Sequence, residues 1–155
     1  MGAGEPGEGD LAPDFELEDQ NGVHVRLSGL KGRKVVLYFY PTDDTPGCTK
    51  EACDFRDNLD KIEAEGAVVL GVSADTLESH KKFAQKYNLN FHLLSDRERK
   101  VITQYGVYKK KKMYGREHYG VERSTFIIDE QGRIIYAQRG VKVDGHIQQV
   151  LEHLQ

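Results

Sequence analysis

The alternation of apolar and polar residues along the chain predicts strands of two kinds. Residues 34–40 and 67–73 are apolar at almost every position, which is typical of strands covered on both faces of a sheet. Residues 15–18 and 23–27 alternate apolar with polar side chains around a turn at 19–22, which predicts a β-hairpin at one sheet edge. We expect the remaining strands at 91–94, 121–129 and 133–139, the last two forming a second hairpin.

Apolar residues at helical spacing occupy the segments between these strands. The predicted helices cover 45–65, 76–87, 96–105 and 144–154. Asp75 or Thr76 is expected to cap the second helix, with Glu78 completing a capping box. Residues 108–119, which include Lys109–Lys112, show no periodicity and predict a long loop. The whole pattern predicts an α/β domain in which helices flank a central mixed sheet.

The stretch after the first buried strand has the composition of a strand-to-helix turn that carries a reactive thiol. Pro41 ends the strand, Thr45 suits the N-cap of a helix and Pro46 suits its first position, so that Cys48 falls in the first turn. Free backbone N–H groups and the positive end of the helix dipole collect there, and they favour the nucleophilic thiolate. Because ligands bind at the carboxyl ends of strands in open α/β sheets, we expect the functional site at this turn.

The two cysteines of the chain, Cys48 and Cys53, are spaced for a switch and not for a structural disulfide. In one continuous helix their Cα atoms lie about 8.5 Å apart, whereas a disulfide needs about 7 Å or less. Joining them therefore requires the first turns of the helix to unwind. This geometry favours a pair that is reduced in a helical form and oxidised in a locally unfolded one.

Length and composition add limits on domain number and compartment. A chain of 155 residues with 38% apolar content is most simply one domain, which we place at 11–155. The glycine-rich residues 1–10 are expected to form a disordered arm and lack the basic and apolar regions of a signal peptide. The longest apolar run is too short to span a bilayer. Two cysteines without a signal sequence predict a reducing, cytoplasmic location.

Charge and histidine spacing exclude several classes of partner. The net charge of −3 gives no reason to expect nucleic acid or an anionic membrane as a partner, and Lys109–Lys112 are interpreted as a solvated face. The six histidines and two cysteines show no spacing typical of zinc or haem sites. No phosphate-binding glycine motif is present either. We therefore expect no metal and no cofactor.

The residues around Cys48 match the signature of a known family. They are Pro41, then Thr45-Pro46-Gly47-Cys48-Thr49, Glu51-Ala52 and Phe55-Arg56-Asp57. This pattern resembles the active-site signature of peroxiredoxins, and a second cysteine five residues on resembles the Q-type branch, also called bacterioferritin comigratory proteins. Further matches lie at 71–75, 105–115, 122–129 and 141–146. The resemblance extends from about Leu11 to the C-terminus and implies a thioredoxin-like fold with an added N-terminal β-hairpin.

The resemblance also implies a role for each residue of the motif. Cys48 is the attacking, peroxidatic thiolate; Arg123 and Thr45 hold the peroxide; Pro41 shields the thiolate from water; and Glu51 orients Arg123. Each role has a plain structural alternative: Cys48 as an inert buried thiol, Arg123 as an ordinary solvated arginine, Thr45 as a simple N-cap, Pro41 as a strand terminator and Glu51 as a partner of the helix dipole.

The activity that follows is that of an atypical two-cysteine thiol peroxidase acting on hydrogen peroxide and organic hydroperoxides. Cys53 resolves the sulfenic acid of Cys48 as an intramolecular disulfide, and thioredoxin or a similar dithiol carrier restores both thiols. Because the resolving cysteine lies in the same chain, a monomer is sufficient.

Two other functions remain open at this point. A redox-switched binding module would use the same unwinding helix as a signal and would consume one equivalent of peroxide, whereas a peroxidase consumes many. A thioredoxin-like disulfide reductase is disfavoured, because two residues separate the cysteines of the thioredoxin motif and four separate Cys48 from Cys53.

Overall fold

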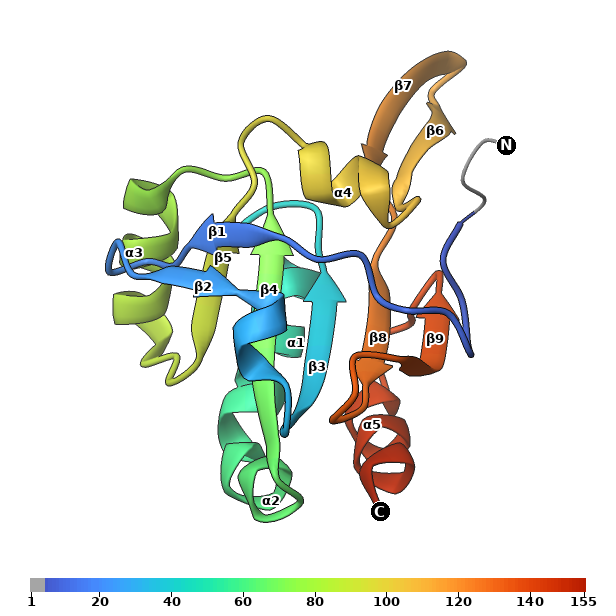
Figure 1. Cartoon of the computed structure of the whole chain (residues 1–155). Helices are drawn as coiled ribbons and strands as arrows, with labels where there is room; N and C mark the ends of the chain where they lie inside the picture. The colour runs from blue at the N-terminus through green and yellow to red at the C-terminus, as the bar shows by residue number, and fades with distance from the viewer. Residues whose placement is uncertain (1–4) are drawn as a thin grey trace.

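The computed structural model describes residues 5–155, apart from the side chain of Met113 (Figure 1). The strands are β1 (Glu16–Glu18), β2 (His24–Arg26), β3 (Lys34–Phe39), β4 (Ala67–Ser73), β5 (His92–Ser95), β6 (Tyr108–Met113), β7 (Arg116–Val121), β8 (Ser124–Ile128) and β9 (Ile134–Arg139). The helices are the 3-10 turn η1 (Leu27–Leu30), α1 (Pro46–Asp57), α2 (Leu59–Ala64), α3 (Leu77–Tyr87), α4 (Lys100–Gln104) and α5 (His146–Leu154).

One mixed sheet of seven strands, in the order β2-β1-β5-β4-β3-β8-β9, forms the centre of the fold. The strands β3, β4 and β5 are parallel neighbours, while β8, β9 and β1 pair antiparallel. The first predicted hairpin lies at one edge and the second at the other, as Figure 1 shows. The predicted fold class, a central mixed sheet flanked by helices, is confirmed. None of the helices within residues 5–155 has the length and apolar content to cross a membrane.

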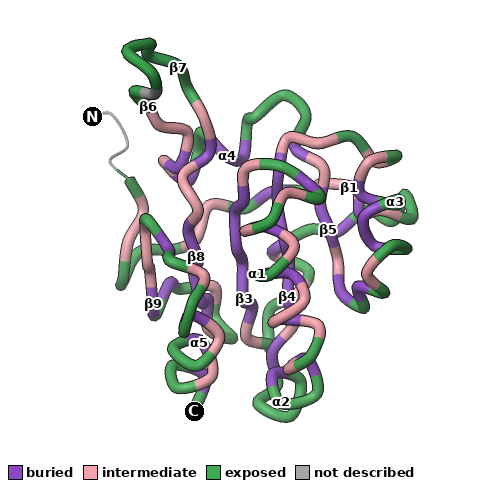
Figure 2. Tube along the Cα trace, turned by 180° about the vertical axis from the view of Figure 1, so that it is seen from behind, coloured by how far each residue is buried: buried purple, intermediate pink, exposed green. Residues whose placement is uncertain are grey.

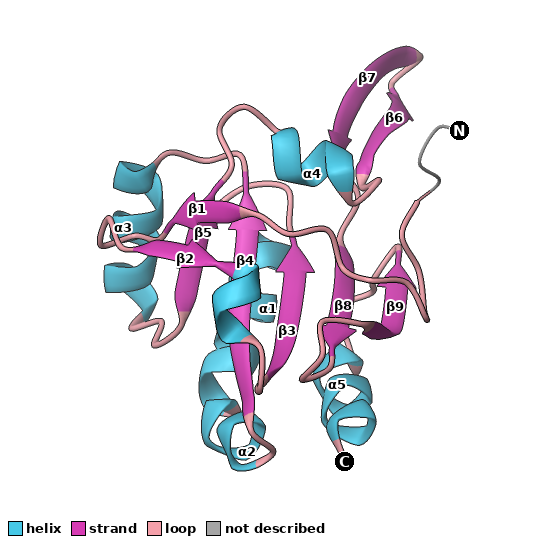
Figure 3. Ribbon diagram, viewed as in Figure 1, coloured by secondary structure: helices cyan, strands magenta, loops and turns pink. Residues whose placement is uncertain are grey.

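The central strand β3 is buried on both faces because its alternate side chains enter two separate apolar clusters. Val36 and Tyr38 pack under α1, α2, α3 and α5 on one face, and Val35 and Leu37 pack under α4, η1 and the first hairpin on the other. Figure 2 shows the buried trace along most of β3 and β4, and Figure 3 shows the helices on the two sides. The loop at the carboxyl end of β3 therefore starts from the most protected part of the molecule.

The helix expected over 45–65 is in fact two helices that meet at Asn58. The Asn58 backbone has φ −115° and ψ 12°, outside helical geometry. Its side-chain amide donates to the Asp54 carbonyl oxygen at 2.9 Å. Asparagine side chains compete in this way with the helical hydrogen bonds of the backbone. Periodicity did not reveal the break, since Phe55, Leu59 and Ile62 are buried on both sides of it.

Two details of the other predicted helices are also corrected. Thr76 caps α3 by accepting from the Ser79 backbone N–H at 3.1 Å, so Ser79, and not Glu78, stands at the third helical position. Glu78 forms an exposed ion pair with Lys82 instead. The helix expected from residue 96 begins only at Lys100, because the Asp96 carboxylate accepts backbone N–H groups and holds the preceding residues in a turn.

The loop expected at 108–119 is a β-hairpin, β6–β7, which stands away from the main sheet (Figure 1). Its tip is Tyr114-Gly115, both with positive φ, as a tight hairpin turn requires. Tyr108 stacks on Tyr119 across the two strands at a ring distance of 5.4 Å. Most of the hairpin is exposed, so neither face carries the apolar alternation by which strands are recognised in a sequence.

The N-terminal residues within the described range differ from the disordered arm that the composition predicted. Gly9 donates its N–H to the Ile134 carbonyl at 2.8 Å, and Arg139 donates to the Pro6 carbonyl at 2.7 Å. Glu5 pairs with Lys109 at the base of the β6–β7 hairpin. Residues 1–4 of the expected arm lie outside the described residues.

Candidate active site

Cys48 lies in the first turn of α1, as the sequence predicted, and is only 2% exposed. Pro46 starts the helix and Thr45 stands at the N-cap with extended backbone geometry. The Thr45 side chain makes no cap bond, however, since its hydroxyl donates to the Thr42 carbonyl at 2.9 Å. The hydrogen of this hydroxyl is therefore committed to the loop, and the oxygen keeps its lone pairs free to accept a hydrogen bond.

Arg123 reaches Cys48 from the neighbouring strand, since it directly precedes β8, whose Ser124 pairs with Phe39 at the end of β3. It was expected inside a strand over 121–128, but it lies between β7 and β8, where the chain passes from the hairpin into the main sheet. Its Nη2 donates to the Cys48 sulfur at 3.4 Å and its Nη1 donates to Glu51 Oε1 at 2.6 Å. The guanidinium thus joins two groups of α1, the thiol and a carboxylate, that lie one turn apart.

Burial governs the charges of this group of three. Glu51 is 2% exposed, and burial raises its pKa from 4.5 to about 7, although the Arg123 charge and hydrogen bond oppose the rise. Burial acts to lower the pKa of Arg123, but Glu51 and Cys48 outweigh it and leave that pKa raised. A positive guanidinium beside a sulfur favours the thiolate form. Glu51 Oε1 accepts the other hydrogen bond of the same guanidinium.

Gly47 belongs to this site for a steric reason that the sequence reasoning did not use. A Cβ at this position would lie 3.1 Å from Arg123 Nη2, tighter than most real contacts. Glycine therefore lets the guanidinium approach the first turn of α1. The signal was available, because Gly47 directly precedes Cys48 in the motif.

Two polar atoms near the site have no partner among the described residues. They are the Tyr38 hydroxyl and Glu51 Oε2, and both are fully buried. Burial, followed by the negative charges of Glu51 and Cys48, raises the pKa of Tyr38, so its hydroxyl stays protonated. The Tyr38 ring lies against Gly71, where a Cβ would meet it at 2.9 Å.

His146 is a further buried residue beside the site. Its Nε2 lies 2.9 Å from Thr125 Oγ1, and burial, together with the Arg123 charge, lowers its pKa. The ring is therefore neutral near pH 7 and adds no second positive charge beside Arg123.

Pro41 and Cys53 are the remaining predicted residues. Pro41 is partly buried in the loop after β3. Cys53 is a free, partly buried thiol on α1, five residues after the free thiol of Cys48. Both cysteines belong to one helix, so their Cα atoms are about 8.5 Å apart and a disulfide between them is not compatible with this conformation.

One group of potential metal ligands occurs among residues 5–155. Ligand atoms of Asp43, Asp75 and His80 lie within 4.8 Å of one another. Hydrogen bonds within the group, and with Tyr40 and the Ser79 side chain, already account for this proximity. The expectation that the protein uses no metal stays a prediction.

Comparison with known proteins gives a consistent result over nearly the whole chain. The AhpC/TSA family matches residues 9–137. A putative peroxiredoxin Bcp of Coxiella burnetii is 51% identical over 146 residues, which cover 94% of this chain and 97% of that protein. Peroxiredoxin Bcp of Bacillus subtilis is also 51% identical over 146 residues, covering 94% of this chain and 93% of the relative.

Comparison with solved structures gives the same result as comparison with the sequences of relatives. A peroxiredoxin Q mutant of Xylella fastidiosa superposes with a TM-score of 0.92 at 37% identity and covers 98% of this chain and 97% of its own. The bacterioferritin comigratory protein of Xanthomonas campestris, studied for its alkyl peroxide reduction activity, has a TM-score of 0.87 at 40% identity. The match covers 90% of this chain and 89% of that chain. These neighbours have the thioredoxin fold, which confirms the thioredoxin-like prediction.

Proposed function

Because the chain belongs to the AhpC/TSA family, within its peroxiredoxin Q or Bcp branch, it is a thiol peroxidase, and we propose that Cys48 and Cys53 divide its reaction between them. Cys48 reduces the peroxide and Cys53 then closes an intramolecular disulfide. A dithiol carrier such as thioredoxin returns both cysteines to the reduced form.

The observation that carries this proposal is the contact between Arg123 Nη2 and the Cys48 sulfur at 3.4 Å. The thiolate attacks one peroxide oxygen, an S–O bond forms and the O–O bond breaks. The departing oxygen takes a proton and leaves as water or an alcohol, and Cys48 becomes a sulfenic acid. Negative charge spreads over both oxygens in the transition state, where donors of a fixed guanidinium lower the barrier.

Thr45 complements Arg123 as an acceptor. Since its hydroxyl donates to the Thr42 carbonyl, its lone pairs are free to accept the O–H hydrogen of the peroxide. The peroxide is then bound between an acceptor and a donor, which orients the O–O bond toward the sulfur. We propose that Pro41 shields the thiolate from water. Glu51 is proposed to orient Arg123 through the 2.6 Å contact between Glu51 Oε1 and Arg123 Nη1.

The second step needs α1 to open. Cys53 attacks the sulfenic sulfur, an S–S bond forms, the S–O bond breaks and water leaves. The two Cα atoms must approach from about 8.5 Å to within about 7 Å, so the first turns of α1 unwind. No second subunit is required for this step, which is consistent with a monomer working in a reducing, cytoplasmic compartment.

The substrate class follows from the same chemistry. The same bonds form and break whether the leaving oxygen carries hydrogen or carbon, so hydrogen peroxide and organic hydroperoxides are both expected substrates. The alkyl peroxide reduction activity studied for the Xanthomonas campestris protein supports including the organic class.

The decisive experiment adds one equivalent of hydrogen peroxide to the reduced protein and measures the intact mass without reductant. The wild type should lose about two hydrogens, Cys53→Ser should gain an oxygen on Cys48, and Cys48→Ser should not change. Cys53→Ser should also lose turnover coupled to a dithiol carrier. Full turnover by Cys53→Ser would make Cys53 structural, and an unreactive wild type would contradict the proposal.

A further inference from the structure

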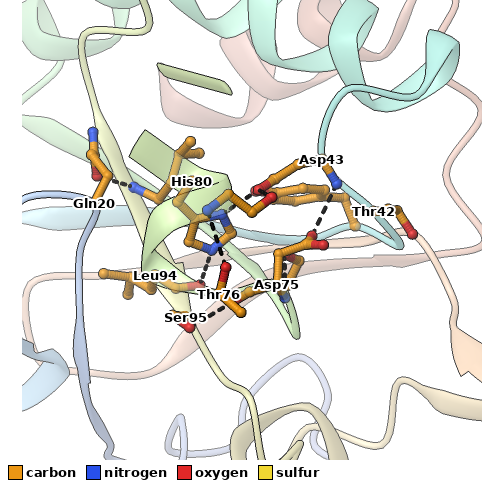
Figure 4. Close-up of polar contacts among 12 residues, drawn as sticks. Gln20, Thr42, Asp43, Asp75, Thr76, His80, Leu94 and Ser95 are labelled. Atoms are coloured by element: carbon orange, nitrogen blue, oxygen red, sulfur yellow. Dashed lines mark hydrogen bonds and ion pairs between the residues drawn. The ribbon is translucent and has the colours of Figure 1, made fainter. Parts of the chain in front are cut away.

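A buried polar cluster lies between the loop after β3 and helix α3 (Figure 4). Asp43 is its centre: one carboxylate oxygen accepts from the Tyr40 hydroxyl at 2.6 Å, and the other accepts from the Ser79 hydroxyl at 2.8 Å and lies 2.7 Å from His80 Nδ1. His80 is 0% exposed and Asp43 is 8% exposed. Removing one side chain of such a network leaves the remaining polar groups without hydrogen-bond partners in a site of low dielectric.

The imidazole ring of His80 is held at both nitrogens. Its Nε2 lies 2.9 Å from the Leu94 carbonyl oxygen, which can only accept, so Nε2 carries a hydrogen. Its Nδ1 faces the Asp43 carboxyl at 2.7 Å. Burial, followed by the charge of Asp43, raises the pKa of Tyr40, so the Tyr40 hydroxyl remains a donor. Both carboxylate oxygens of Asp43 therefore have hydrogen-bond partners, and these partners hold the side chain in a single position.

The backbone at Asp43 connects this cluster to the active site. The Asp43 N–H donates to Asp75 Oδ2 at 2.9 Å, and the same oxygen accepts from the Ser73 hydroxyl at 2.6 Å. The carbonyl of the same peptide unit belongs to Thr42, and it accepts from the Thr45 hydroxyl. A peptide unit is planar and rigid, so fixing its N–H end also fixes the direction of its carbonyl.

We infer that Asp43 and Asp75 are positioning residues for peroxide reduction, because they fix the Thr42–Asp43 peptide unit whose carbonyl orients the Thr45 hydroxyl. This inference rests on the proposed function, in which Thr45 accepts a hydrogen bond from the peroxide. A peptide unit free to rotate would release the Thr45 hydrogen, and the hydroxyl would then no longer present only lone pairs to the substrate.

The first test compares Asp43→Ala with Asp43→Asn. Asparagine keeps an oxygen for the Tyr40 hydroxyl and places an amide group beside His80 Nδ1 and the Ser79 hydroxyl, so it preserves the geometry without the charge. Asp43→Ala should slow sulfenic acid formation on Cys48 by about 10- to 100-fold, and Asp43→Asn should stay within about threefold of the wild type. The readout is the second-order rate constant for a single oxidation by hydrogen peroxide, measured well below the melting temperature.

A double-mutant cycle separates positioning through Thr45 from a general loss of structure. If Asp43 acts through Thr45, the Asp43→Ala/Thr45→Val protein should react no more slowly than Thr45→Val alone. Losses that multiply in the double mutant would overturn the inference. Asp75→Ala should behave in the same way, and because Asp75 is only partly buried, this variant carries the test if Asp43→Ala does not fold.

Asp19 supplies the matched control. It is 3% exposed, its Oδ2 lies 2.9 Å from His92 Nδ1, and its Oδ1 accepts the N–H groups of Asn21 and Val23, far along the chain from the site. Asp19→Ala should lose stability but keep the oxidation rate of the wild type. An equal slowing in Asp19→Ala and Asp43→Ala would overturn the inference. A wild type whose Cys48 does not react would instead overturn the proposed function on which it rests.

Discussion

The two cysteine-bearing ends of α1 are held in opposite ways. At one end Cys48 is buried and bonded to Arg123, which in turn is bonded to the buried Glu51. At the other end Cys53 is partly exposed, and the nearby Lys50–Asp54 ion pair lies on the surface. Buried charge-assisted bonds are strong, whereas surface ion pairs contribute about 0–1 kcal/mol.

This difference between the Cys48 and Cys53 regions suits one helix to two steps, peroxide attack and disulfide formation, that need opposite properties of α1. Peroxide attack needs Cys48 to be rigid, and resolution needs the same turn to open. In the proposed mechanism the attack itself removes the thiolate charge, since the sulfur becomes a sulfenic acid. The charge-assisted bond from Arg123 to the sulfur then weakens at the moment when α1 must unwind, which lowers the free-energy cost of opening its first turn.

The largest effect is expected from removing the contact at the Cys48 end. Arg123→Met should slow sulfenic acid formation by about 10²- to 10³-fold, the usual cost of losing one donor to a transition-state oxyanion. Arg123→Lys should recover only part of the rate, because an ammonium lacks the planar fork that serves both Cys48 and Glu51. Rates would be measured by rapid quench of a single oxidation followed by mass spectrometry.

The matched control is Arg56→Met, at the Cys53 end of the same helix. Arg56 donates to the Tyr87 carbonyl oxygen and does not touch Cys48, so its loss should leave the first step unchanged. Equal slowing by Arg56→Met and Arg123→Met would show that both act only through the stability of α1.

A second prediction concerns the pH dependence of stability that Glu51 imposes. Its pKa rises from 4.5 in the unfolded chain to about 7, so the folded protein binds this proton more tightly. The free energy of unfolding should therefore fall as pH rises from about 4.5 to 7, by up to about 3 kcal/mol at about 1.4 kcal/mol per pH unit. Glu51→Gln should remove this contribution. Urea unfolding of the reduced proteins at pH 5, 6, 7 and 8 measures both slopes.

The exposed Glu63 on α2 offers the control for this measurement. Glu63→Gln should keep the slope of the wild type, because it removes one glutamate and leaves the buried Glu51 in place. Parallel slopes in Glu51→Gln and the wild type would contradict the assignment of the buried proton to Glu51.

The smallest effect is expected at the surface near Cys53. Lys50 pairs with Asp54 at 3.1 Å and lies 3.7 Å from Asp144. Lys50→Ala should speed disulfide formation after oxidation by about twofold, because an exposed helix pair contributes about 0.3–0.5 kcal/mol. Lys82→Ala removes a similar pair, Lys82–Glu78, from α3 and should change nothing. A slower disulfide step in Lys50→Ala would mean that the pair assists resolution.

Much of the site could be predicted because its chemistry is local in the sequence. The apolar run of β3, the Thr45-Pro46 start of α1 and the position of Cys48 follow from propensity and capping rules. Arg123 is different, since no local rule brings a residue 75 positions away to a thiol. Only the resemblance to a family identified it, and even then its backbone was expected in a strand and not between two sheets.

What could not be predicted depends on contacts between distant segments or on exposed surface. The Asp43–His80 pair joins residues 37 positions apart, and each alone is an ordinary polar residue in its own segment. The β6–β7 hairpin lacks apolar alternation because water covers most of it. The break at Asn58 arises from one side-chain hydrogen bond, which a periodic pattern of buried residues does not reflect.

The contact of Arg139 with the Pro6 carbonyl has a consequence for how the protein is made. It joins residues 133 positions apart, together with the strand contacts of Gly9 and Asp10 to Ile134. Closing so long a loop is slow compared with forming local structure. During synthesis the segment around Pro6, Gly9 and Asp10 can therefore dock only after β9 has been made.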